Sequence, residues 1–424
     1  MSSAILNSNA SSALISATNA VSSITNPFIY SYGNKGQLTS SAVPAHARIV
    51  STSQTSNIGF SQNIDFQVLK SGFLESAFIK YTIQNNSGAE AWANGLIGNL
   101  LLEEISLMTQ GKIISHSTPF SRAARMSDAP YGRKKNLEQA YGLTAGEISI
   151  ADGASKTFYV PLGLSCFDTP ANFLNTSFLE PINIRIRTAG KSQYFGSHAN
   201  GGSVPVDLTM TSMELIQVFR MLDSAEEQKC IQANYSEDNL VSVEYDSICE
   251  NTSFTPAAAV SQVASHVITT NRSIAKLYIA VESTVNTTAT VANTEAVGKY
   301  LELETIKISA NGQEVLSVDA KFMGLCMGLD MGSGSSHNAV GNYFDTQHVH
   351  TRNIYCFDLT LVKDLSCFTG MISARELNQL KVEVTTSATT AVVNQIHNLH
   401  VAMICPQLNS VSSASGKITT SLSS

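Results

Sequence analysis

Charged residues are scarce in this sequence. Only 14% of the 424 residues are Asp, Glu, Lys or Arg, whereas about 25% is usual in soluble proteins. The net charge of −7 argues against a general nucleic-acid-binding protein, which needs a basic surface. Serine, threonine, asparagine and alanine take the place of the missing charges. We expect this composition to suit extended strands and large buried contacts between subunits rather than a highly solvated surface.

Signals for membrane insertion and secretion are also missing. No run of 18 apolar residues is present, so we expect no transmembrane helix. The first residues carry no Lys or Arg, and Ser and Asn interrupt their apolar stretch, so we expect no secretory signal peptide. The seven cysteines are scattered and form no Cys-x-x-Cys motif. This pattern indicates small buried thiols and folding in a reducing compartment.

What the sequence does contain is a repeat of domain length. The segment LEEISLMTQG at 102–111 returns 201 residues later as LETIKISANG at 303–312. Leu-Ser-Cys-Phe occurs at 164–167 and again, at the same offset, at 365–368. Two separate matches at one offset, far longer than the period of a solenoid, indicate a duplicated domain.

Within the first copy, apolar and polar residues alternate as they do in β-strands that bury one face. The alternation is clearest in INIRIR at 182–187. It predicts strands at 64–68, from 78 onward, and at 102–107, 113–114, 158–162, 182–186 and 208–222. Residues 119–142 instead have helical spacing, and Pro130 and Gly132 divide them into two short helices.

The second copy predicts matching strands at 277–281, 303–308, 377–384 and 399–403, and residues 322–342 take the place of the helices. Each copy thus carries about eight short strands in about 165 residues, a pattern typical of a sandwich or jelly roll. We therefore predict an all-β fold of two tandem eight-stranded jelly rolls, a double jelly roll, with short helices in the inter-strand connections.

Composition sets the predicted domain boundaries. These are a flexible N-terminal arm at 1–56, a first jelly roll at 57–222, an inter-domain connection at 223–256, a second jelly roll at 257–408 and a flexible C-terminal tail at 409–424. The arm is rich in Ser, Ala, Asn and Thr, and Lys35 and Arg48 are its only charges. Such a segment does not bury enough surface to fold alone. It is either a disordered tail or an assembly arm that orders against a neighbouring subunit or an inner surface.

The repeated turn at 102–112 and 303–313 resembles the strand-Gly-Gln-strand signature of double jelly-roll major capsid proteins. FYVPL at 158–162 and EPINI at 180–184 are similar to that family's next paired strands. The family belongs to the lineage of tailless double-stranded-DNA phages, adenoviruses and large eukaryotic DNA viruses. The resemblance covers about 57–408, and the duplication of the whole set carries it.

The resemblance implies a structural protein of the virion. In this family a homotrimer forms a pseudo-hexagonal capsomer that tiles an icosahedral shell, with loops on the outer face. The implied partners are copies of the same chain, neighbouring capsomers, penton and minor capsid proteins, and an internal lipid membrane faced by the N-terminal arm. Assembly is expected in the host cytoplasm or nucleus. The implied function needs no catalytic residue, no cofactor, no metal and no sequence-specific nucleic acid.

Two histidines close together in the sequence form a candidate metal site. His348 and His350, with Asp345 upstream, place two imidazoles on one strand face, as at the start of a cupin metal site. The following residues, 351–354, supply no further Glu or His, and two ligands do not complete a zinc site. We interpret the pair as structural or interface histidines, with ion binding as the alternative.

A basic cluster comprises Arg122, Arg125, Arg133, Lys134 and Lys135. It favours either phosphate or genome contact or, because acidic residues interleave with it, a solvated loop or an intersubunit ion pair. The second interpretation is preferred.

Other motifs lack the residues that chemistry requires. The glycine-rich segment 332–336 has no following Gly-Lys-Ser/Thr and predicts a flexible turn. Cys166 and Cys367 have no identifiable histidine base, so the repeated Leu-Ser-Cys-Phe is interpreted as a packing element. Methionines recur at four-residue spacing at positions 323, 327 and 331, which is typical of a packed helix face.

Two other classes of protein remain open at this point. One is a tandem β-sandwich binding protein such as an adhesin, a viral spike or a minor capsid subunit. An adhesin would favour a signal peptide and aromatic-rich loops, whereas this chain has a single tryptophan, Trp92. The other is an enzyme on a cupin-like double barrel, which needs three or four convergent metal ligands.

Overall fold

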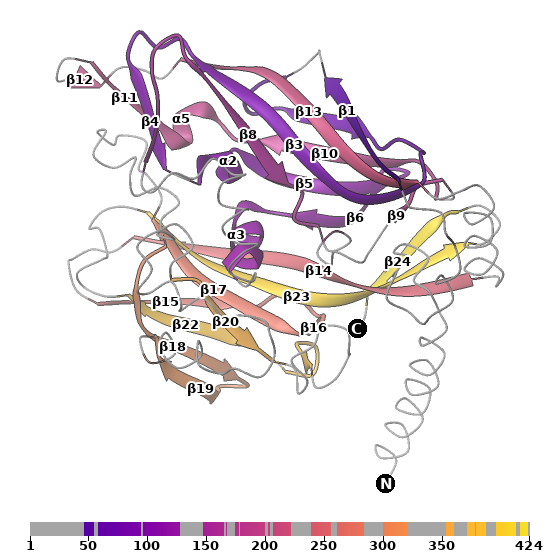
Figure 1. The fold of residues 1–424 in the computed structure, drawn as a ribbon. Helices are drawn as coiled ribbons and strands as arrows, with labels where there is room; N and C mark the ends of the chain where they lie inside the picture. Colours follow the sequence, from indigo (N-terminus) through magenta and orange to yellow (C-terminus); the bar gives the residue numbers. More distant parts are fainter. Residues whose placement is uncertain are drawn as a thin grey trace.

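In the computed structural model, the described residues form mainly β-strands with a few short helices. The structure describes residues 46–54, 58–94, 96–127, 147–164, 167, 174–177, 179–199, 202–203, 207–221, 239–255, 261–283, 300–320, 322, 353–359, 371–377, 379–386, 396–412 and 416–422. Figure 1 shows them as two stacked halves, with the first half above the second.

Two antiparallel sheets pack face to face in the first half. Sheet A has the order β1 (His46–Gln54), β13 (Leu208–Met221), β3 (Phe73–Asn85), β8 (Ser155–Pro161), with β9 (Leu174–Asn175) beside β3. Sheet B has the order β2 (Asn63–Gln67), β10 (Ile182–Thr188), β5 (Leu102–Thr109), β6 (Lys112–Ser117). A single apolar core fills the space between the two sheets.

The second half repeats this arrangement. Sheet D has the order β14 (Asn239–Phe254), β23 (His397–Ser412), β17 (Lys276–Ser283), β20 (Tyr355–Asp358), with β24 (Ile418–Leu422) beside β23. Sheet E has the order β15 (Gln262–Val267), β22 (Lys381–Thr386), β18 (Leu303–Ala310), β19 (Gln313–Asp319). A second apolar core lies between these sheets.

Smaller elements complete the described fold. Sheet C has the order β12 (Gly202–Ser203), β11 (Phe195–Ala199), β4 (Glu90–Asn94), β7 (Glu147–Ile150), and β16 (Ser273–Ile274) pairs with β21 (Ile372–Ser373). The helices are α2 (Ile97–Leu100), α3 (Pro119–Ser127) and α5 (Lys191–Tyr194). No helix in the described ranges is long and apolar enough to cross a membrane.

Alternation of side chains along each strand produces this layering. On β10, Ile182, Ile184 and Ile186 point into the core and are at most 3% exposed. Arg185 and Arg187 point to solvent from the other face, because successive side chains of a strand alternate between the faces of its sheet. Arg185 forms two hydrogen bonds with Asp65 on the neighbouring strand β2.

The repeated sequence motif forms the same hairpin in both halves. β5 and β6 are joined by Gln110 and Gly111, whose φ angles are 46° and 78°. β18 and β19 are joined by Asn311 and Gly312, whose φ angles are 55° and 77°. Positive φ at both central residues is the geometry of a type I′ turn, which matches the twist of the flanking strands. Glycine at the second position meets this requirement without steric strain.

The strand order confirms the predicted double jelly roll. In each half the first strand pairs with the last long strand, and the eight strands divide between two sheets in the same order. The expected helical insertion also lies where it was predicted in the first copy, because α3 begins at Pro119 directly after β6. The remainder of that insertion, 128–146, lies outside the described residues.

Three segments that the sequence placed outside the jelly rolls form strands. Residues 46–54 of the predicted flexible arm are β1, residues 239–254 of the predicted connection are β14, and residues 418–422 of the predicted mobile tail are β24. β1 and β14 are equivalent, since each pairs with the last long strand of its half. Both lie at the end of their sheet order and mix polar residues into both faces, which weakens the alternating pattern that identifies a strand.

Candidate functional site between the two jelly rolls

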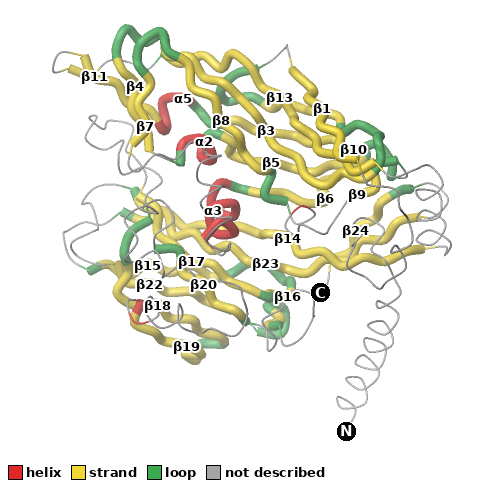
Figure 2. Tube along the Cα trace, viewed as in Figure 1, coloured by secondary structure: helices red, strands yellow, loops and turns green. Residues whose placement is uncertain are grey.

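Helix α3 connects the two halves. It follows β6 of the first half and packs on sheet D of the second, as Figure 2 shows in red between the strand layers. Thr118 and Ser121 cap its N-terminus, because Ser121 N donates to Thr118 Oγ1 (3.3 Å) and Thr118 N donates to Ser121 Oγ (2.9 Å). This reciprocal cap directs the following residues away from the first core and toward the second half.

Phe120 is the centre of the apolar contact. Its ring stacks on the imidazole of His400 with 5.0 Å between centroids, and meets the ring of Tyr300 edge-on at 5.7 Å. Ala123 and Ala124, one turn further along α3, belong to the same buried cluster. The outer face of sheet D, which would otherwise meet solvent, is therefore covered by a helix of the first half.

Arg122 holds α3 to the first half. Its guanidinium donates five hydrogen bonds to oxygen atoms of Asn99, Ser117 and Leu102. The residue is only 1% exposed. Gly163 lies against it with φ of +64°, and a Cβ there would stand 2.5 Å from Arg122 Cγ. The helix is thus fixed in the first half by buried polar contacts and in the second by apolar contacts.

The burial of Arg122 corrects the predicted basic cluster. The sequence predicted an exposed side chain, either on a phosphate or in a solvated loop or intersubunit ion pair. Arg122 instead lies inside the protein, where carbonyl and side-chain oxygens receive its protons. Arg125 lies on α3 and is partly buried. The other members of the cluster, Arg133, Lys134 and Lys135, lie outside the described residues.

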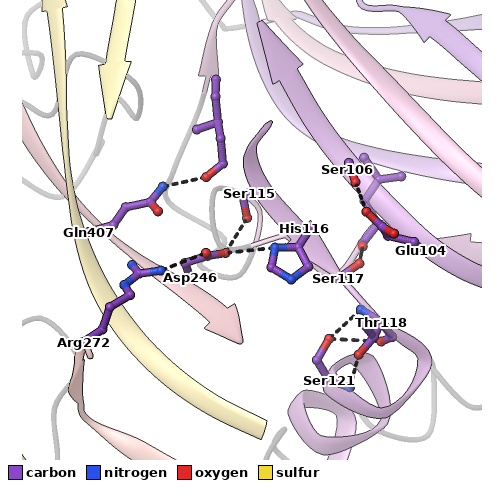
Figure 3. A network of polar contacts seen from close by, with 12 residues as sticks. Glu104, Ser106, Ser115, His116, Ser117, Thr118, Ser121, Asp246, Arg272 and Gln407 are labelled. Carbon is purple, nitrogen blue, oxygen red and sulfur yellow. Dashed lines mark hydrogen bonds and ion pairs between the residues drawn. The ribbon is translucent and has the colours of Figure 1, made fainter. Parts of the chain in front are cut away.

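A polar network crosses the junction beside α3. Figure 3 shows Asp246 of β14 between Arg272 and the end of β6. Arg272 Nη1 lies 3.2 Å from Asp246 Oδ2, and each side chain is 9% exposed. From the first half, Ser115 Oγ donates to Asp246 Oδ1 at 3.4 Å, and His116 Nδ1 lies 4.0 Å from the same oxygen. Because Asp246 of the second half contacts Ser115 and His116 of β6, this network favours one register between the halves.

Three hydrogen bonds to backbone atoms add to the junction. Gln407 Nε2 of β23 donates to the carbonyl of Ile114 at 2.7 Å. Glu180, just before β10, accepts a hydrogen bond from Ile418 N at 3.2 Å, and its own N–H donates to the carbonyl of Gly416 at 3.1 Å. Ile418 is 5% exposed and packs in the core of the first half. The chain end therefore returns to the first jelly roll after completing the second.

His400, which stacks on Phe120, also contacts an acidic side chain. Its Nε2 lies 2.7 Å from Glu282 Oε2, and Cys249 is a second hydrogen-bonding partner. Burial alone would lower the pKa of His400, but its hydrogen bonds with Cys249 and Glu282 and the negative charge of Glu282 outweigh this effect and raise the pKa to about 10. An imidazole that is protonated at neutral pH does not accept a proton as a general base, so we interpret the group as structural.

A second histidine–carboxylate pair lies within the second half. His266 Nε2 is 2.7 Å from Glu250 Oε2, and His266 Nδ1 is 2.7 Å from Thr252 Oγ1. Burial would raise the pKa of Glu250, but hydrogen bonds from Thr269 and His266 lower it below its usual value. All four residues hold β14 and β15 together, and their polar atoms are engaged with one another.

Several predicted sites fall outside the described residues. These are His348 and His350 with Asp345, the segment 332–336, Cys166, Cys367, and the methionines at 323, 327 and 331. In the part of the chain that the structure describes, no group of three or more His, Cys, Asp or Glu side chains is arranged to hold a metal ion. Three described cysteines lie outside any disulfide: Cys249 is half-buried, and Cys356 and Cys405 are buried. Burial raises the pKa of Cys405 to about 12.

Sequence reasoning missed most of the junction. Helical spacing identified Phe120, Ala123 and Ala124 as an apolar face, but nothing in the pattern named the surface that this face covers. Asp246 carries no local signal, because its contacts with Ser115 and His116 depend on the packing of sheet D against sheet B. The sole available sign was the polar character of β14.

Solved structures share this fold. A chain of the PBCV-1 virus capsid matches with a TM-score of 0.65 and 16% identity, over 91% of this chain and 98% of that chain. The Faustovirus major capsid protein matches with a TM-score of 0.60 and 10% identity, over 89% and 92%. A chain of the Sputnik virophage structure matches with a TM-score of 0.54 and 12% identity, over 92% and 91%. No protein-family model and no curated protein matches the sequence.

Proposed function

We propose that this chain is a major capsid protein. Three copies assemble as a trimer with six jelly rolls around its axis, and this pseudo-hexagonal capsomer tiles an icosahedral shell. The observation that carries the proposal is the repeated strand order of two jelly rolls joined by a buried contact, over nearly the whole length of capsid chains of the same fold.

Physical considerations support this function. A shell protein stands at very high local concentration, where free strand edges promote uncontrolled pairing. Permanent subunit interfaces are large and more apolar than transient ones. A chain with 14% charged residues and 43% hydrophobic residues has the composition for such interfaces. Its exposed apolar residues include Ile49, Val263, Val315 and Phe322, each at least 60% exposed.

The remaining partners follow from the same proposal. Neighbouring capsomers, penton proteins and minor capsid proteins contact the trimer in the virion, which forms in the host cytoplasm or nucleus. The N-terminal arm faces the shell interior, where an internal lipid membrane is its partner. No catalytic residue, cofactor or metal takes part in this function.

The native mass of the purified protein tests the proposal. Light scattering should give about three times the chain mass of 45.3 kDa, and negative-stain images of the same peak should show hexagonal outlines. A stable elongated monomer would overturn the proposal in favour of a tandem-sandwich binding protein.

A further inference from the structure

The junction within one chain has two unlike surfaces. We call the surface supplied by the first half the helix side, which comprises α3 and the end of β6. We call the surface supplied by the second half the sheet side, which is the outer face of sheet D. On this sheet side Tyr278, Ala402 and Ile404 are 3%, 1% and 4% exposed, because α3 covers them.

Because the two halves repeat, the end of β19 with Phe322 corresponds to the helix side in the second half, and the outer face of sheet A corresponds to the sheet side in the first. The names helix side and sheet side are kept for these described residues. One version of each is used inside the chain. The other two are the helix side of the second half and the sheet side of the first half.

The helix side of the second half is exposed. Ile114 and Val315 occupy the same bulge of the repeated hairpin, since each is skipped by the pairing of its two strands. Ile114, whose carbonyl accepts a hydrogen bond across the junction, is 3% exposed, whereas Val315 is 61% exposed. The same contrast holds for the phenylalanine that follows each hairpin. Phe120, after β6, is 3% exposed, whereas Phe322, after β19, is 60% exposed.

The cap preceding Phe322 is also repeated. Asp319 Oδ1 accepts a hydrogen bond from Phe322 N at 2.8 Å, as Thr118 Oγ1 accepts one from Ser121 N. This alignment places Phe322 one position beyond the equivalent of Phe120. An apolar ring thus stands just beyond the same cap in both halves, buried in one and exposed in the other.

The sheet side of the first half is open as well. Strand pairing makes Phe78, Ile216 and Val218 the equivalents of Tyr278, Ala402 and Ile404. These three side chains are half-buried where their equivalents are buried. At the edge, Ile49 is 70% exposed, whereas Ser247, its equivalent on β14, is 1% exposed. Ile49, Val218, Ile216 and Phe78 thus lie together on this face as an apolar group, bordered by Ser51 and Ser76.

We infer that the helix side of the second half, with Phe322 and Val315, docks on the sheet side of the first half of a second copy of this chain. This inference rests on the proposed function and names the contact that builds its trimer. The contact between chains then repeats the contact within the chain. Such an interface is heterologous, because its two surfaces differ, and heterologous interfaces form either closed rings or open filaments. A ring of three chains contains six equivalent junctions.

Two substitutions test each surface separately. Phe322→Glu places a charge on the helix side, and Ile49→Glu places one on the sheet side. Both side chains are at least 60% exposed, so neither change disturbs the core of the single chain. Val263→Glu is the matched control: Val263 is 61% exposed on β15, and its equivalent, Asn63, is exposed on β2. Native mass spectrometry and circular dichroism are recorded for each.

At a concentration at which the unaltered protein is trimeric, each interface variant should have the mass of one chain, and the control should remain trimeric. A buried unpaired charge should weaken the contact about tenfold or more. A mixture of Phe322→Glu and Ile49→Glu chains should form dimers, because it offers one intact helix side and one intact sheet side.

The alternative results have different meanings. A variant that stays trimeric, or a mixture that stays monomeric, overturns this interface and leaves the proposed function standing. An unaltered protein that is itself monomeric overturns the proposed function, and this interface with it.

Discussion

At the scale of single residues, Arg122 is the side chain on which the position of α3 depends. Replacing it with methionine keeps most of its volume but removes five hydrogen bonds to buried oxygens. Buried acceptors that lose their donors destabilise a fold strongly, so Arg122→Met should lower the free energy of unfolding by about 3 kcal/mol or more. Urea denaturation followed by circular dichroism measures this.

Arg185 provides the control for that substitution. Arg185 forms two hydrogen bonds, both with Asp65. Unlike Arg122, it lies at the surface: its side chain is 46% exposed, and that of Asp65 is 54% exposed. Exposed ion pairs contribute at most about 1 kcal/mol. Equal destabilisation by Arg122→Met and Arg185→Met would mean that the buried contacts of Arg122 do not fix α3.

His400 makes stability depend on pH. Burial lowers the pKa of His400, but the hydrogen bonds with Cys249 and Glu282 have a larger combined effect and raise the pKa to about 10 in the folded protein. In the unfolded chain the pKa of histidine is near 6.5. The folded state therefore binds one proton more than the unfolded state between these values. Its contribution is complete below about pH 6.5 and is lost as pH rises toward 10, by up to about 1.4 kcal/mol per pH unit.

A comparison with His400→Gln isolates this effect. Between pH 7 and pH 9, the unaltered protein should lose about 2–3 kcal/mol more stability than the variant, measured as urea midpoints at each pH. Parallel pH dependence of the two proteins would show that His400 does not hold an extra proton in the folded state.

At the scale of elements, β24 is a strand that the sequence assigned to a mobile tail. Ile418 on this strand is 5% exposed and packs in the core of the first half, although β24 pairs with β23 of the second. Ile418→Ala should lower the free energy of unfolding by about 2–3 kcal/mol. Val263→Ala, at a 61% exposed position, should change it by less than about 0.5 kcal/mol. Equal thermal denaturation curves for the two variants would place Ile418 outside the core.

The elements also show which parts of the fold the sequence could predict. β10 alternates cleanly, and the turn at Gln110 and Gly111 has a repeat at Asn311 and Gly312, so local chemistry was sufficient for both. β1 and β14 were missed because they end their sheets and carry polar residues on both faces. Local alternation is a signal only where one face is buried and the other is solvated.

The site was less predictable than the fold, and for a different reason. Phe120 and His400 are separated by 280 residues, and Asp246 and the end of β6 lie in different jelly rolls. Arg122 looked like a member of an exposed basic cluster because its sequence neighbours are charged. Its burial depends on Asn99 and Leu102, and no local pattern carries that information.

At the scale of the whole molecule, the question is whether the two jelly rolls unfold as one unit. Each half has its own apolar core, so each satisfies the condition for independent folding. The cluster around α3, the contacts of Asp246 with Ser115 and His116, and the packing of Ile418 join the halves. If these contacts are strong compared with the difference in stability between the halves, calorimetry of the unaltered protein should show one transition.

Phe120→Asp should divide that transition into two. The side chain is 3% exposed at the centre of the junction, where a carboxylate would be buried against Tyr300 and the apolar face of sheet D. Neither core contains this residue, so each half should keep its own strand pairing and far-ultraviolet circular dichroism should change little. Val263→Asp, on the exposed face of β15, should leave a single transition. A single transition in Phe120→Asp, lowered but undivided, would mean that one half does not stay folded once the contact with the other is lost.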